Sequence, residues 1–166
     1  MLMLISHITK SIGQTSYNIT YYVLPDYLAI GSDNDYFLCP TTPKLAQRIA
    51  NSTGMTLPTS QMVDEIYQAA SYKMAPITQS PGPQMTQVPY FNQHNNSVWT
   101  VRQSNLGNHP LGTLVGGNKK DVVISNEIYE NQNEYVVIYG WHTSVGNPIQ
   151  PTYNGHAIDY VDYSHG

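Results

Sequence analysis

The sequence has few charged residues, a single cysteine and no long apolar run, and each shortage excludes a class of protein. Only 11% of the 166 residues are charged, against about a quarter in an ordinary soluble domain. Seven basic residues and a net charge of −4 argue against nucleic-acid binding, which needs clustered Lys and Arg to neutralise phosphates. One cysteine cannot form an intrachain disulfide. No apolar run approaches the about 20 residues of a membrane-spanning helix, and coiled-coil heptads are missing.

Neutral polar residues and tyrosine take the place of the missing charges. Asn, Gln, Ser and Thr number 14, 11, 13 and 14, and there are 14 tyrosines. Tyrosine supplies apolar area with a hydroxyl that neutral neighbours can bind. We therefore expect residues 1–166 to form one α+β domain around a modest core. This composition favours an extracellular or cell-surface location, although residues 1–10 are too short and too weakly patterned for a signal peptide.

The first 40 residues are predicted to be β-rich. Apolar and polar side chains alternate over residues 17–23, which is the period of a half-buried strand. Residues 27–38 contain two short apolar runs separated by Gly31-Ser32-Asp33-Asn34. This pattern is typical of a hairpin.

Residues 42–73 are predicted to form a helical hairpin that packs on the sheet. Thr42 begins one apolar stripe and Thr59 begins another, and a threonine before such a stripe is a helix-start signal. A DNA-binding helix-turn-helix is the alternative for this pair. We reject it because the second helix carries Asp64 and Glu65 near its start and no base-reading arginine.

The second half of the chain contains two segments that differ in composition and in predicted structure. Residues 74–109 contain several prolines and one charged residue, and predict an extended connection that wraps over the fold. A linker between domains is the alternative for this segment. Residues 110–166 are again β-rich, with strands at 121–124 and 135–139. Together with residues 1–40 they predict a mainly antiparallel or mixed sheet.

Histidine and aspartate gather near the C-terminal end of the chain. His156, Asp159, Asp162 and His165 follow one another at intervals of three residues, and His142 follows a predicted strand that ends at Gly140. An aspartate that binds one ring nitrogen of a histidine fixes its tautomer and raises its basicity. Such a pair suits general base catalysis or metal binding. The alternative is a buried hydrogen-bond network with neighbouring tyrosines.

These residues predict a hydrolase that acts on an extracellular or cell-wall polymer. Two or three histidines with a carboxylate can hold a divalent metal such as zinc and leave one position open for water. The candidate metal ligands are His142, His156, Asp159 and Asp162. A metal-free site would use His142 or His165 as the base, with Lys119 or Lys120, of which we favour Lys120, stabilising an oxyanion.

Two readings without catalysis compete with the hydrolase. A surface or assembly protein, such as a filament, coat or adhesin subunit, would use the low charge and the many neutral amides to pack against copies of itself. A carbohydrate-binding module would use Trp99 and Trp141 as stacking platforms, with Asn and Gln binding glycan hydroxyls. The expected partners are thus a polymer or glycan, or the chain itself, with no nucleic acid and no membrane span.

Several stretches of the sequence resemble a group of uncharacterised bacterial proteins. The similarity covers most of the chain, and because the group has no established activity, the resemblance implies no function for this chain. The stretches are Pro25-Asp26-Tyr27-Leu28-Ala29-Ile30-Gly31, Leu57-Pro58-Thr59 with Met62-Val63-Asp64, Tyr139-Gly140-Trp141-His142, Pro148-Ile149-Gln150-Pro151 and Asp162-Tyr163-Ser164-His165-Gly166.

Overall fold

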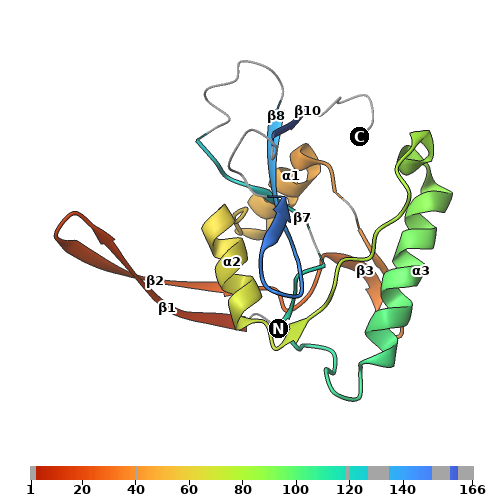
Figure 1. The fold of residues 1–166 in the computed structure, drawn as a ribbon, viewed down its shortest axis with the longest axis horizontal. Coiled ribbons are helices and arrows are strands. Elements are labelled where there is room, and N and C mark those ends of the chain that lie inside the picture. Colours follow the sequence, from red (N-terminus) through yellow and green to blue (C-terminus); the bar gives the residue numbers. More distant parts are fainter. Residues whose placement is uncertain (1–2, 40, 119, 127–134, 151–157, 161–166) are drawn as a thin grey trace.

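The chain has an α+β fold, as the sequence predicts (Figure 1). The computed structural model describes residues 3–39, 41–118, 120–126, 135–150 and 158–160; for 3–11, 135–136, 150 and 158–160 it describes the backbone alone. Within these residues the strands are divided over four small sheets rather than one. No helix in the described part of the chain is both long and apolar enough to cross a membrane.

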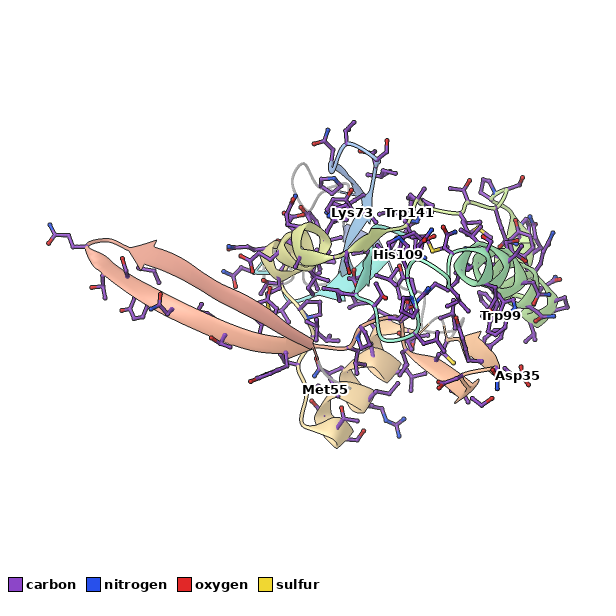
Figure 2. The ribbon with its side chains drawn as sticks, turned by 90° about the horizontal axis from the view of Figure 1, so that it is seen from below. Asp35, Met55, Lys73, Trp99, His109 and Trp141 are labelled. Carbon is purple, nitrogen blue, oxygen red and sulfur yellow. The ribbon has the colours of Figure 1, made fainter. Side chains whose placement is uncertain are left out.

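The β-rich character of residues 1–40 is confirmed by two antiparallel hairpins. Strands β1 (Met3–Ile12) and β2 (Thr15–Val23) form the first, and β3 (Ala29–Ser32) and β4 (Asp35–Leu38) form the second. The β1–β2 hairpin projects from the rest of the molecule as a long arm (Figures 1 and 2). At its base the side chains of Tyr21 and Val23 contact the core.

The two helices predicted within residues 42–73 are confirmed, but they make few contacts with each other, and among the described residues only the second packs on a sheet. Helix α1 (Pro43–Thr53) begins after Thr42, whose side chain accepts a hydrogen bond from the amide of Leu45, and Gly54 ends it in the left-handed conformation. Helix α2 (Ser60–Ala69) begins after Thr59, which caps it in the same way. A threonine cap satisfies one of the helix's free amides and stabilises it by roughly 1 kcal/mol.

The prediction of an extended connection over residues 74–109 is wrong for most of that segment. Residues 74–82 lack regular structure, the 3₁₀ helix η1 (Pro83–Thr86) and helix α3 (Val88–Ser104) follow, and residues 105–109 form a turn after the helix. Proline is accepted in the first turn of a helix, where its missing N–H is not needed. Pro89 occupies that position in α3. The helix buries three of its residues, Asn95, Val98 and Arg102, so its apolar stripe is too sparse to signal a helix.

The C-terminal strands surround one central strand, β8 (Tyr135–His142). It pairs antiparallel with β7 (Lys120–Val123), β9 (Pro148–Gln150) and β10 (Ile158–Tyr160). The sequence predicts that this strand ends at Gly140, but it continues to His142, so that this histidine lies within the sheet. A short parallel pair, β5 (Tyr72–Lys73) and β6 (Val115–Gly116), lies apart from this sheet.

Helix α2 packs on β8 and forms the core beneath the candidate site. Val63 of α2 lies in one buried cluster with Val123, Val137 and Tyr139. Val137 is fully buried, and burying an aliphatic side chain of this size contributes about 1.5–3 kcal/mol. The helix and the strand are therefore held at a fixed separation, which decides where their polar side chains meet.

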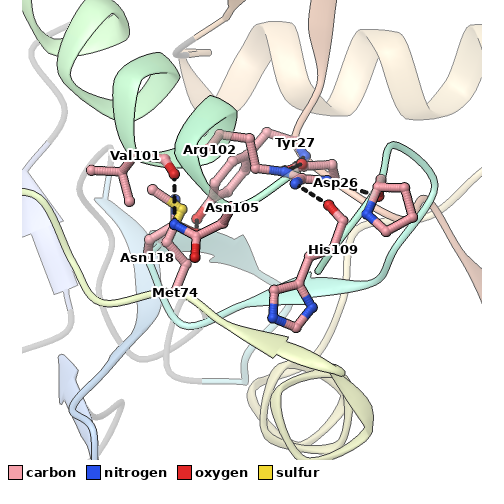
Figure 3. A network of polar contacts seen from close by, with 9 residues as sticks. Asp26, Tyr27, Met74, Val101, Arg102, Asn105, His109 and Asn118 are labelled. Atoms are coloured by element: carbon pink, nitrogen blue, oxygen red, sulfur yellow. Dashed lines mark hydrogen bonds and ion pairs between the residues drawn. The ribbon is translucent and has the colours of Figure 1, made fainter. Parts of the chain in front are cut away.

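A buried arginine joins α3 to Asp26 in the N-terminal part of the chain and to the turn that follows the helix (Figure 3). Arg102 of α3 is 3% exposed, and its Nε donates to Asp26 over 3.2 Å. Its two remaining nitrogens donate to the backbone oxygens of His109 and Pro110. The ring of Tyr72, which stacks on the His109 ring at 4.4 Å, lies beneath the guanidinium. This arrangement satisfies the charge and ties α3 to the N-terminal half.

Candidate functional site

The candidate site lies where α2 crosses the end of β8. Asp64 comes from the helix, and Tyr139 and His142 come from the strand. Val63 and Tyr67, one turn apart on α2, are buried, and Asp64 follows Val63 at the border of this buried face. The carboxylate of Asp64 therefore sits at the edge of the helix–strand contact, within reach of both strand residues.

Asp64 accepts hydrogen bonds from two neighbours at once. His142 Nε2 lies 2.9 Å from Asp64 Oδ1, and the hydroxyl of Tyr139 lies 2.9 Å from each carboxylate oxygen. An ionised carboxylate can only accept, so Nε2 carries the proton that it donates. Asp64 thereby fixes the tautomer of His142, which is the pairing that the sequence analysis expects of a histidine in a reactive site.

The exposure of the three groups is unequal, and it is the aspartate that faces solvent. The side chain of His142 is 2% exposed, whereas that of Asp64 is 44% exposed. Tyr139 is buried as well. A molecule arriving from solvent would meet the carboxylate first, with the histidine and the tyrosine holding it from behind.

Tyr139 remains a hydrogen-bond donor over a wide pH range. Burial of its hydroxyl raises its pKa above the ordinary value of 10.0, and the hydrogen bond to Asp64 and the charge of that carboxylate raise it further. All three causes disfavour the tyrosinate, because a second negative charge beside Asp64 would be buried without compensation.

An aromatic stack fixes the imidazole from the opposite side. The rings of Tyr67 and His142 are 4.2 Å apart and inclined by only 8°. The Tyr67 hydroxyl donates to the backbone oxygen of Thr143 over 3.1 Å. Gly117 lets the backbone pass this ring closely: with φ of +103°, a Cβ there would lie 3.1 Å from the Tyr67 ring. The hydrogen bond to Asp64 and the stacked Tyr67 ring therefore hold the imidazole of His142 in one orientation.

The backbone before His142 is strained. Gly140 and Trp141 have φ of +116° and +62° inside β8. The left-handed conformation costs a non-glycine residue such as tryptophan roughly 1–2 kcal/mol. Strained residues persist where the surrounding structure fixes them, and they cluster at functional sites. Here the strain lies in the residue directly before the buried histidine.

The structure places the predicted site residues in different surroundings. His142 belongs to the cluster, but Lys120 is exposed in β7, with its ammonium 4.5 Å from the centre of the Trp141 ring. Asp159 lies in β10 opposite Val136, with only its backbone described. His156, Asp162 and His165 lie outside the described residues.

A metal centre finds no support in the described part of the chain. The residues placed there include no group of three or more His, Cys, Asp or Glu side chains that could hold an ion. The set His142, His156, Asp159 and Asp162 includes residues beyond that part, so the proposed zinc site stays a prediction.

Sequence reasoning missed Asp64 and Tyr139 as site residues. Asp64 lies 78 positions before His142, and spacing along the chain cannot bring together residues so far apart. Two signals were nevertheless present. Asp64 borders the apolar stripe of its helix, and Tyr139 is in the strand that leads to His142.

The contacts with Asp64 favour the neutral form of Tyr139, so the free energy of unfolding should decrease at alkaline pH. Its folded-state pKa is raised above 10.0, so the stability it contributes is complete below pH 10 and is lost as the pH rises further. We expect the free energy of unfolding to fall above about pH 10, and to fall less steeply in Tyr139→Phe, which has no proton to lose. Urea unfolding at a series of alkaline pH values measures this. Parallel curves for the two proteins would contradict it.

Comparison of this chain with protein-family models, with curated proteins and with solved structures finds no match in any of the three.

Proposed function

We propose that the protein is a hydrolase in which the carboxylate of Asp64 activates water. The observation that carries the proposal is the pairing of an exposed carboxylate with a buried histidine at 2.9 Å. Asp64 accepts a proton from water as the water oxygen bonds to the electrophilic carbon of the substrate, and it returns this proton to the leaving group as the scissile bond breaks. The N–H of His142 and the O–H of Tyr139 hold the carboxylate in one orientation. General base catalysis by a positioned side chain contributes about 10²–10⁴-fold to a rate.

This proposal changes the roles expected from the sequence. His142 is buried, so it acts as a positioning residue, and Asp64 takes the place of the base that contacts substrate. Lys120 remains the proposed oxyanion partner. It pairs with Gly140 of β8, two residues before His142, and its ammonium lies over the Trp141 ring. The proposed substrate is a polymer of the cell wall or the extracellular space.

Replacing Asp64 by asparagine tests the catalytic role. Asp64→Asn keeps the shape of the side chain but removes its ability to accept a proton, and it should lower hydrolysis by about 100-fold or more. The assay is a panel of ester, glycoside and peptide substrates, and thermal unfolding checks that the variant is folded. Asp33→Asn, an exposed aspartate in the β3–β4 turn, is the matched control and should keep full activity. Absence of hydrolysis on the whole panel, or full activity in Asp64→Asn, would refute the proposal.

A second candidate function, self-assembly, is favoured by the β1–β2 arm. A two-stranded hairpin is at best marginally stable in water, yet this one exposes large apolar side chains, with Ile12 73% and Tyr22 62% exposed. Residues 11–24 contain no charged residue, although charges on an edge strand are what prevent pairing with another chain. An antiparallel edge can pair with the same edge of a second copy about a twofold axis. A second copy of the chain is therefore the partner that the arm fits best.

Sedimentation tests whether the arm associates. We expect the parent chain to form a dimer or a larger assembly, and Ile19→Lys, which places a charge on the exposed arm, to be a monomer. Val145→Lys changes an aliphatic side chain that is more exposed than Ile19 and lies in the loop after β8, and this control should still associate. A parent chain that is strictly monomeric would contradict this candidate.

A further inference from the structure

A polar groove lies along α3, on a part of the chain that the proposed catalytic site does not use. It consists of two adjoining shallow depressions of about 360 and 380 Å³ that are open to solvent and share Gln93 and Ser97 in their lining. Helix α3 forms one wall, and residues 78–84 form the other. Figure 1 shows this second segment running beside α3 up to η1.

The groove is neutral and rich in amides. Pro89 and Tyr90 are its only apolar lining residues, and no charged residue lines it. Asn92, Gln93 and Asn96 are exposed, and their side-chain amides make no hydrogen bond to any residue that the structure describes. Asn92 and Asn96 are four positions apart, so they lie on the same face of the helix. The helix thus presents a row of amides that can both donate and accept.

The opposite wall is fixed in place by hydrogen bonds. The side chain of Gln84 donates to the backbone oxygen of Ser80, and that of Gln79 donates to the backbone oxygen of Tyr90. The Tyr90 hydroxyl also donates to the Ser80 oxygen, and His94 Nε2 lies 3.0 Å from the backbone oxygen of Ile77. A groove with such a wall needs little ordering when a ligand binds, which lowers the entropic cost of binding.

We propose that this groove binds a neutral oligosaccharide. An amide side chain donates and accepts, as a sugar hydroxyl does, so each amide of the row can bind one hydroxyl in either direction. An ionic ligand would find no opposite charge to replace its water. The ring of Tyr90 lines the groove and offers an aromatic face against which a sugar ring can pack. The lining has no apolar pocket that would select the side chains of a peptide.

The groove does not include Trp99 or Trp141, the two tryptophans that the sequence predicts as stacking platforms for a sugar. The Trp99 ring packs edge-on against Tyr36 at 4.5 Å, and the Trp141 ring is covered by Lys120. Neither ring lines the groove. The proposal is also independent of the hydrolase, because Asp64 is not among the lining residues.

A glycan array, followed by calorimetry with the best neutral tetrasaccharide, tests the groove. We expect the parent chain to bind a neutral oligosaccharide, and the double variant Asn92→Ala/Asn96→Ala to bind it about tenfold more weakly or worse, since two hydrogen bonds are lost. Gln47→Ala, which removes an exposed amide from α1, is the matched control and should bind as the parent does. Asp64→Asn should also bind normally, so failure of the hydrolase leaves this result interpretable.

Three results would overturn the proposal. The first is an array on which no neutral glycan is bound, or on which only charged glycans are bound. The second is glycan binding of unchanged affinity in the double variant. The third is binding of a neutral Asn- and Gln-rich peptide, but of no glycan, in a form that the double variant loses.

Discussion

The fold depends on one buried cation in a chain that has few charges. Arg102 is 3% exposed and binds Asp26 and two backbone oxygens, so it joins α3 to segments 76 residues before it and 7–8 residues after it. Removing one partner of a buried ion pair typically costs 3–5 kcal/mol. His142 repeats the pattern: it is buried, binds Asp64 and is stacked on a tyrosine. In both cases an aspartate from the first half of the chain satisfies a buried nitrogen donor from the second half.

The second of these pairs differs from the first in what it leaves exposed. Asp26 is 27% exposed and accepts from the Arg102 guanidinium, each of whose three nitrogens donates a hydrogen bond within the protein. Asp64 is more exposed, at 44%, and is held by a histidine and a tyrosine on a rigid helix–strand contact. The Asp64 carboxylate is held by hydrogen bonds from the protein and is open to solvent, so it can accept a proton from a bound molecule. The Arg102 guanidinium is buried, and its network is suited to stabilising the fold. The strained backbone at Trp141 also lies beside the second pair.

The sequence allowed the helix starts, the β3–β4 hairpin and the strands around residues 121–139 to be predicted, because caps, turns and apolar runs are local signals. Helix α3 was missed since its buried face holds Asn95 and Arg102 beside Val98, which weakens the apolar period. His142 was identified as a site residue from its place after a strong strand. Asp64 was not, because its contact with His142 arises only when α2 packs on β8.

The most direct test of the account is a double-mutant cycle on hydrolysis with Asp64→Asn and His142→Gln. The two residues share one hydrogen bond, and residues that act as a unit give losses that do not add. The account predicts that the double variant is scarcely slower than Asp64→Asn alone. Losses that multiply, so that each residue acts independently of the other, would contradict it.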